Sequence, residues 1–386
     1  MIKVAKAASY FRPSRQGINH SYSEETARLD QLLTYSALAL TAVGLIMVYS
    51  ASTYIAVNNN RADWSIFIRQ GLLAIVGLSV FFVAGRLDVS FYRKHIKVAL
   101  IAICALMAAQ LILPIGPIVH GTRRWVSLGF FNLQTSELAR CAVIIFLARV
   151  LDEKPTLAVK SNKELWKILG IIAIPFLLIN LQPDMSSSLV MAAVAGMVLF
   201  VGGLGFTNIL IIAGTGFVGV SLLLMREAYM RERLWSFIGS VASGEPLNYQ
   251  TEQSLIAFGN GGWFGMGLGQ GKQKMLFLPE PHTDFIFSII GEEGGMLAAV
   301  VIIAAFIVLF MTSIRIAARQ PNGFKALLAA GLAGSIMLYA LINMGVAVGL
   351  LPVTGLPLPF ISNGGTSLVV SLWSIGVLRS ILYSSG

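Results

Sequence analysis

The sequence predicts an all-α integral membrane protein with about ten transmembrane helices and a large outer loop, which contains an interfacial helix and a re-entrant segment. Of its 386 residues, 56% are hydrophobic and only 12% are charged, and the mean hydropathy is +0.77. A soluble domain could not cover so much apolar side chain with polar surface. Ten apolar stretches each approach the ~20 residues that a helix needs to cross the hydrocarbon.

The predicted spans divide the chain into a cytoplasmic tail over residues 1–30 and one membrane domain over residues 31–386. The tail contains no apolar core like that of a signal peptide, so we expect the first span to direct insertion. No repeat of fixed period divides the membrane domain. In chain order the spans are residues 32–56, 66–85, 96–115, 136–151, 166–181, 186–203, 207–225, 285–314, 324–350 and 367–383.

The distribution of positive charge predicts the orientation. Most of the 28 Lys and Arg residues fall in the N-terminal tail and in alternate connections between spans. Cytoplasmic loops carry an excess of Lys and Arg, so we expect both termini to be cytoplasmic. The net charge of +10 then lies near anionic headgroups of the lipid bilayer and requires no nucleic-acid partner. Cys104 and Cys141 fall in spans, which favours packing residues over a disulfide framework.

Four segments rich in Gly, Pro and polar residues then face outward: residues 116–133, 182–185, 226–284 and 352–366. In the third and largest, apolar and charged residues alternate over 229–238, which is typical of a helix that lies in the membrane interface. Residues 249–268 are apolar but interrupted by glycines, which favours a re-entrant segment over a full span.

The string Leu-Pro-Glu-Pro-His-Thr-Asp-Phe at residues 278–285 leads from the large loop into the eighth span. Asp284 would stand at the edge of the hydrocarbon, where partial desolvation raises the pKa of a carboxyl group and makes it a better proton acceptor near neutral pH. Thr283 or Asp284 could equally cap the following helix. Glu292 and Glu293 follow inside the span, where a structural role, such as a buried salt bridge, is the favoured interpretation.

A second cluster of charge surrounds the outer end of the fourth span. Arg123 and Arg124 precede it, and Glu137 and Arg140 are three residues apart, so they share one helix face. If that face lines a cavity, Arg140 could hold a phosphate while Glu137 orients it or a sugar hydroxyl. The alternative is a local ion pair, with the two other arginines at lipid headgroups.

Many glycines lie between residues 259 and 271, close to Lys272 and Lys274. No strand precedes them, so a dinucleotide-binding loop is disfavoured, and close helix packing or a backbone nest for an anion fits better. The histidines show no metal-ligand spacing. A site on the outer face has no ATP or nucleotide sugars, so its substrate must carry its own leaving group, as a lipid pyrophosphate does.

Several strings, in order, resemble the SEDS family (shape, elongation, division and sporulation), and the match covers nearly all of the chain after the tail. The pair Gln273-Lys274, the Ser-Ala-Ser at 50–52 and Gly291-Glu292-Glu293 resemble the cell-division branch, and the Lys-Gly-Trp stretch of the elongation branch is absent. The strings are MVYSAS (47–52), RRW (123–125), QPD (182–184), GMGLG (265–269), HTDFIF (282–287) and PLPFIS (357–362).

The resemblance implies a peptidoglycan glycosyltransferase that polymerises lipid II at the outer face of the bacterial cytoplasmic membrane, at the division septum. It also implies a class B penicillin-binding protein, the septal transpeptidase, and other divisome membrane proteins as partners. Alternatives are a lipid II flippase, a scaffold that only activates its partner, and the elongation-type polymerase of the same family.

The family's essential aspartate matches Asp284, and its conserved glutamate matches Glu137. Arg140 stands where the family has Lys and Thr135 where it has Pro, and Asn363 and Thr366 replace Tyr and Ser. We expect Asp284 to take the proton from the attacking sugar hydroxyl. His282, Thr283 and Ser362 are expected to contact substrate, and the pyrophosphate charge to be stabilised by Arg123, Arg124, Arg140 and Lys274 or by a divalent cation, Mg²⁺ or Mn²⁺.

Overall fold

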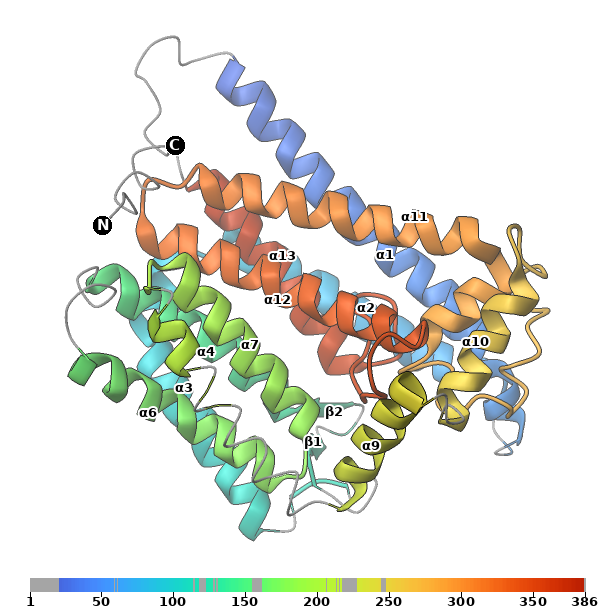
Figure 1. Cartoon of the computed structure of the whole chain (residues 1–386). Helices are drawn as coiled ribbons and strands as arrows, with labels where there is room; N and C mark the ends of the chain where they lie inside the picture. The colour runs from blue at the N-terminus through green and yellow to red at the C-terminus, as the bar shows by residue number, and fades with distance from the viewer. Residues whose placement is uncertain are drawn as a thin grey trace.

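The computed structural model describes residues 21–58, 60, 62–113, 115–117, 123–127, 129, 131–154, 162–205, 207–212, 214, 216, 228–243 and 248–384. The elements, shown in Figure 1, are α1 (Ser21–Asn58), α2 (Ser65–Arg86), α3 (Val89–Ile112), β1 (Trp125–Ser127), β2 (Asn132–Gln134), α4 (Thr135–Glu153), α6 (Asn162–Leu181), α7 (Met185–Val201), α9 (Ala228–Ser243), α10 (Tyr249–Gly261), α11 (Ile286–Ala318), α12 (Gly323–Ala347) and α13 (Gly365–Tyr383).

The described helices confirm the predicted class of multi-spanning helical membrane protein. Seven of them are long and apolar enough to cross a membrane, namely α1, α2, α3, α6, α11, α12 and α13, and α7 is a shorter apolar helix. Helix α4 matches the predicted span at 136–151 but carries more charge. The predicted span at 207–225 falls largely outside the described residues.

Two segments of the predicted outer loop have the expected form. Helix α9 contains the stretch that was expected to lie in the interface, and α10 is a short helix that packs against α11, as a re-entrant segment would. One detail of the predicted outer face was not expected: β1 and β2 form an antiparallel pair, with Trp125 opposite Gln134. Strands of three residues are too short to give a recognisable alternation in the sequence.

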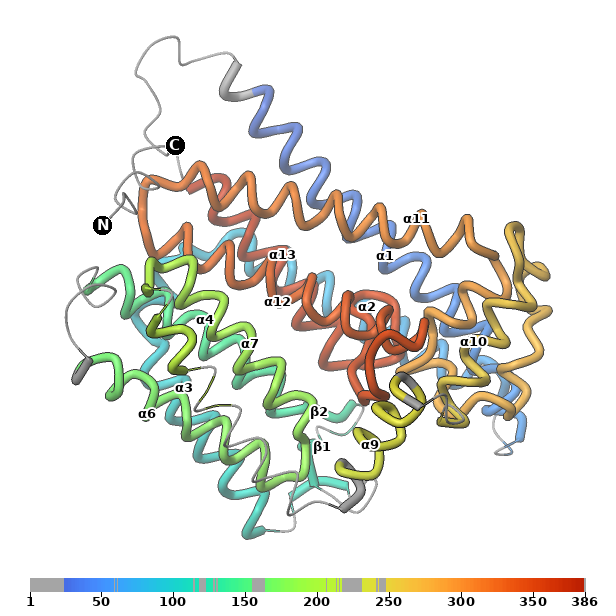
Figure 2. The backbone as a smooth tube through the Cα atoms, viewed as in Figure 1, coloured from blue at the N-terminus to red at the C-terminus, as the bar shows by residue number. Residues whose placement is uncertain are grey.

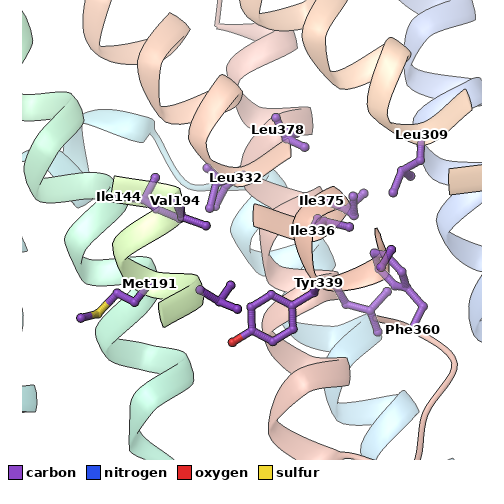
Figure 3. Close-up of a cluster of buried hydrophobic side chains, with 14 of the residues drawn as sticks. Ile144, Met191, Val194, Leu309, Leu332, Ile336, Tyr339, Phe360, Ile375 and Leu378 are labelled. Atoms are coloured by element: carbon purple, nitrogen blue, oxygen red, sulfur yellow. The ribbon is translucent and has the colours of Figure 1, made fainter. Parts of the chain in front are cut away.

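Burial separates central helices from those that face lipid. In the apolar stretches of α12 and α13, 72% and 78% of the residues are buried, against 22% in that of α3. Helix α4 packs against α3, α7 and α12, so nearly all of its residues from 135 to 148 are buried. Figure 3 shows part of the core between these helices, where Ile336 of α12 lies beside Ile375 of α13, and Val194 of α7 lies between Ile144 of α4 and Leu332 of α12.

Small residues allow the closest helix contacts, as is common in membrane proteins. A Cβ atom at Gly376 of α13 would lie 2.5 Å from the carbonyl oxygen of Phe81 in α2, so only glycine fits there. The start of α1 and the end of α13 meet at one end of the bundle (Figure 2), where Asp30 accepts hydrogen bonds from Arg379 Nε at 2.8 Å and Tyr383 Oη at 2.7 Å. Both ends of the described chain are therefore on one side of the bundle.

Candidate active site

A cavity of about 550 Å³ lies at the opposite end of the bundle, where α2, α4 and α13 begin and the chain enters α11. Its floor and walls combine loop residues with one face of α2. The lining residues are Ser65, Ile66, Arg69, Leu73, Arg124, Trp125, Phe131, Asn132, Gln134, Asp184, Glu280, His282, Thr283, Asp284, Gly355, Pro357, Asn363, Gly364, Gly365, Thr366 and Ser367. The sequence string at 278–285 thus contributes four members, Glu280 and residues 282–284.

The carboxyl group of Asp284 lines this cavity and has a strongly raised pKa. Burial, and then the negative charge of Glu280, raise its pKa from 3.8 to about 7. The positive charge of Arg233 and a hydrogen bond from Thr283 act in the opposite direction. A carboxylate with this pKa can accept a proton at neutral pH and release it again to water.

The backbone of Asp284 is held from α12. The side chain of Asn343 donates one hydrogen bond to the carbonyl oxygen of Asp284 at 2.8 Å and another to that of Leu356, also at 2.8 Å. Asn343 is buried, with 1% of its surface exposed. It therefore ties the residue before α11 to the loop that leads to α13.

The neighbours of Asp284 are held from that same loop. Ser362 Oγ donates to the carbonyl oxygen of Thr283 at 2.5 Å, and the N–H of Asn363 donates to the carbonyl oxygen of His282 at 2.9 Å. Ser362 is buried and does not line the cavity. Ser362, which was expected to contact substrate, is thus engaged with the backbone of Thr283. Burial lowers the pKa of His282, which favours its neutral form.

The alternative role of Thr283 or Asp284 as a helix cap is not what the structure has. Helix α11 begins at Ile286, its N-cap residue is Phe285, and no side-chain hydrogen bond caps it. Thr283 Oγ1 donates instead to Glu280, at 3.1 Å to the carboxylate. The side chain of Asp284 is thus available to the cavity.

Among the described residues, the cations that line the cavity are Arg69 of α2 and Arg124, just before β1. Arg124 donates to the carbonyl oxygens of Gln182 and Pro183 and lies 3.8 Å from Asp184. Arg69 was not singled out from the sequence. An ionisable residue inside an apolar span was the signal that could have identified it.

Glu137 and Arg140 share a face of α4 as predicted, but they pair with each other and do not line the cavity. Arg140 also donates to Ser335 of α12 at 2.5 Å and lies over the ring of Tyr339, 4.1 Å from its centroid. Because α4 is enclosed by other helices, both charges need partners within the bundle. This is the local ion pair of the alternative interpretation. Arg123 also does not line the cavity.

Lys274, expected to contact pyrophosphate, is buried elsewhere. Its ammonium group lies 2.6 Å from Glu293 and 2.9 Å from Ser50 Oγ. The glycine-rich segment does form a backbone nest for anions, and the anions are the carboxylates of Glu292 and Glu293. The favoured structural interpretation of the two glutamates agrees with these contacts.

No group of three or more His, Cys, Asp or Glu residues in the described part of the chain is placed to hold a metal ion. The acids that line the cavity, Asp184, Glu280 and Asp284, are not brought together as such a group.

The fold and the cavity define a multi-spanning membrane protein whose helix bundle has, at one end, a cavity that contains a carboxyl group of raised pKa and two arginines. A family model described as cell cycle protein, covering FtsW, RodA and SpoVE, matches residues 30–385. The chain belongs to this family, which confirms the SEDS resemblance.

Relatives agree over almost their whole length. A probable peptidoglycan glycosyltransferase FtsW of Geobacter metallireducens is 38% identical over 93% of this chain and 96% of the relative. Stage V sporulation protein E of Bacillus subtilis is 37% identical, over 91% and 96%. Among solved structures, a chain of a peptidoglycan synthase complex that coordinates polymerization and crosslinking has a TM-score of 0.74. The rod shape determining protein RodA of Thermus thermophilus has a TM-score of 0.68. Each is 25% identical and covers 92% of this chain and 97% of its own.

Proposed function

We propose that the outer cavity is the site at which this multi-pass membrane protein, a peptidoglycan glycosyltransferase of the cell-division type, polymerises lipid II with Asp284 as its base. The observation that carries the proposal is a carboxyl group with a pKa of about 7 in a cavity, at one end of the helix bundle, that also contains two arginines. General bases work best when their pKa lies near the operating pH.

The reaction needs one proton acceptor. Asp284 takes the proton of the 4-hydroxyl group of GlcNAc in the incoming lipid II as its oxygen forms a bond to C1 of the MurNAc at the lipid-linked end of the strand. The bond between C1 and the pyrophosphate breaks, and its electron pair leaves with undecaprenyl pyrophosphate. The α-linkage to pyrophosphate becomes a β-linkage in the glycan by this single displacement, so no covalent enzyme intermediate is required.

The leaving group is a stable anion that needs no proton but does need positive charge beside it. Arg69 and Arg124 take this role in the proposal, because they are the described cations that line the cavity with Asp284. A guanidinium group can bind two phosphate oxygens at once. Arg140 and Lys274 are engaged in buried ion pairs instead.

The polymerase is favoured over a flippase by the contacts of the intramembrane charges. A flippase would use Glu137, Arg140 and Glu292 to carry a charged headgroup across the bundle. Glu137 and Arg140 pair with each other, and Glu292 accepts hydrogen bonds from the N–H groups of Lys272 and Gln273. These contacts support structural roles, whereas the described cavity lies at the bundle's end.

The same proposal includes the setting of the reaction. Both termini are cytoplasmic, the cavity faces outward, and the protein works at the division septum with a class B penicillin-binding protein and other divisome membrane proteins. The likeness to a chain of a peptidoglycan synthase complex supports a partner that crosslinks the new strands.

The test is polymerisation of labelled lipid II by the purified full-length chain, with and without a class B penicillin-binding protein, followed by analysis of glycan strands. We expect Asp284→Asn to reduce strand synthesis at least about a hundredfold, because loss of a general base typically costs 10²–10⁴ in rate. Asp63→Asn, the same change at a residue that does not line the cavity, is the matched control. Normal synthesis by Asp284→Asn would refute the role of Asp284, and scrambling of lipid II without synthesis by the wild type would favour the flippase.

A further inference from the structure

The segment between α10 and α11 is attached to the helix bundle by buried charges that the proposed reaction does not use. Glu293 of α11 accepts hydrogen bonds from Lys274 Nζ at 2.6 Å and from Ser50 Oγ of α1 at 2.7 Å. Lys274 Nζ also donates to Ser50 Oγ at 2.9 Å. The exposed fractions are 9% for Ser50, 6% for Lys274 and 1% for Glu293, so this cluster is closed to the cavity and to bulk water.

A second set of contacts holds the same segment by its backbone. The carboxylate of Glu292 accepts hydrogen bonds from the N–H groups of Lys272 at 3.0 Å and Gln273 at 3.1 Å, and that of Glu293 accepts one from the N–H of Gly269 at 3.1 Å. A Cβ atom at Gly271 would lie 2.8 Å from Glu292 Oε2. The position of the segment therefore depends on the positions of the two carboxylates.

The contacts extend towards Asp284. The N–H of Leu278 donates to the carbonyl oxygen of Gln273 at 2.9 Å, and the side chain of Leu278 is buried with 1% of its surface exposed. From there the chain passes through the turn at Glu280 to Asp284 and directly into α11. Residues 274–286 thus form a loop whose one end is fixed to α11 at Glu293 and whose other end is α11 itself.

We infer that the Ser50–Lys274–Glu293 cluster positions the base: by fixing one end of this loop, it sets where the carboxyl group of Asp284 lies in the cavity. The inference rests on the proposed function. It assigns Lys274 to positioning and not to substrate contact. Removing one partner of a buried ion pair leaves the other charge uncompensated, so the loop would move to hydrate it.

The test uses the steady-state kinetics of lipid II polymerisation by the full-length chain with its penicillin-binding partner. Lys274→Met and Glu293→Gln should each lower kcat at least about tenfold while KM stays within about threefold, because a misplaced base slows chemistry without weakening binding. The exchange Lys274→Glu with Glu293→Lys should regain at least about tenfold over Lys274→Met, since it restores the attraction. Lys272→Met, an exposed lysine in the same segment, should behave as the wild type.

A second measurement is independent of activity. In a chain with Cys104 and Cys141 changed to Ala, Leu278→Cys should be protected from maleimide because Leu278 is buried. Lys274→Met and Glu293→Gln should speed its labelling at least about tenfold if the loop is released, and Lys272→Met should not. If the charge variants fail to fold, the milder Ser50→Ala, which keeps the ion pair, takes their place. It should lower kcat and speed labelling, each by less than the effect expected of the charge variants.

The outcomes separate the two proposals. Absence of synthesis by the wild type would count against the proposed function, while maleimide labelling of the Leu278→Cys chain still decides whether the cluster holds the loop. Wild-type kcat and labelling in the folded cluster variants would overturn the inference alone. A rise in KM at constant kcat in Lys274→Met would also overturn it, because it would place Lys274 in contact with substrate.

Discussion

Two opposite charges from different segments act on the carboxyl group of Asp284. Glu280, four residues earlier, raises its pKa, and Arg233 of α9 lowers it. Glu280 has a φ of 51°, in the left-handed region that non-glycine residues seldom adopt, and its carbonyl oxygen accepts the N–H groups of Thr283 and Phe285. The strained turn thus places a negative charge beside the proposed base.

The pH dependence of polymerisation should report this group. Because the ionised form of Asp284 accepts the proton, kcat should rise with pH and level off above the pKa of about 7. Glu280→Gln removes a charge that raises this pKa, so the acidic limb of the profile should move to lower pH. We would measure kcat between about pH 5.5 and about pH 9, a range that includes the expected pKa of about 7. A limb that does not respond to Glu280→Gln would assign the titration to another group.

The same shift predicts how stability depends on pH. The pKa of Asp284 is raised on folding from 3.8 to about 7, so the protonated form is favoured in the folded state. Its contribution to stability is fully present below about pH 3.8 and is lost as the pH rises through about 7. Asp284→Asn should therefore unfold at the same or a higher temperature than the wild type at pH 8. A clearly lower unfolding temperature would mean that the carboxylate stabilises the fold.

At this scale, the sequence was enough to single out Asp284 but not its surroundings. The string around it was unusual for a span boundary, and desolvation there predicted a raised pKa. The two arginines of the cavity come from segments far apart in the chain, and only one of them stood in a recognisable motif. The pairing of Lys274 with Glu293 could not be predicted, because it depends on how a glycine-rich segment folds back on α11.

Among the elements, α9 does not line the cavity but acts on it through the charge of Arg233. Arg233 donates to the carbonyl oxygen of Val353 at 3.3 Å, which ties α9 to the loop before α13. Trp235, two residues on, has 63% of its surface exposed. The helix was predicted from its alternating residues, but its contact with the loop, and hence its charge near Asp284, required the structure.

Arg233→Gln should change the pH profile in the direction opposite to Glu280→Gln. Loss of the positive charge removes an influence that lowers the pKa of Asp284, so the acidic limb of kcat should move to higher pH. Glutamine can still donate a hydrogen bond, which limits the change to charge. Arg231→Gln, an exposed arginine in the same helix, is the control. Equal profiles for the two variants would show that Arg233 does not act on the base.

Helix α4 shows why an element can be predicted from spacing while the surroundings of its charged face cannot. Its limits and the shared face of Glu137 and Arg140 followed from spacing. Whether that face meets a cavity or another helix depends on which helices surround α4, and α12 supplies Ser335 and Tyr339 to Arg140. The family's Pro is replaced by Thr135, whose hydroxyl donates to Gln110 of α3 at 2.8 Å, so this difference is accommodated by a bond between helices.

For the whole molecule, hydropathy predicted the class of fold because each span must satisfy its own backbone hydrogen bonds in lipid. The predicted orientation rests on the positions of Lys and Arg alone. The arrangement of helices around α4, and the cavity formed by loops that are distant in sequence, depend on side-chain packing that no pattern along the chain records.

The proposed orientation can be checked in spheroplasts by labelling single cysteines. In a chain with Cys104 and Cys141 changed to Ala, an impermeant maleimide should label Lys272→Cys in spheroplasts whose membrane is intact. Arg86→Cys, exposed at the other end of the bundle, should react only after the membrane is permeabilised. The reverse pattern would put Asp284 on the cytosolic side, where the proposed reaction has no lipid-linked glycan strand to extend.

The modest size of the cavity limits how much of the glycan it can hold. Pockets of ≈ 300–1,000 Å³ hold roughly one drug-sized molecule, and about 550 Å³ is within that range. A glycan of many sugars would have to extend into the aqueous space as it grows, leaving only its newest units inside. Contacts in this cavity reach only the newest sugars, so we expect each addition to proceed alike whatever the length of the strand already made.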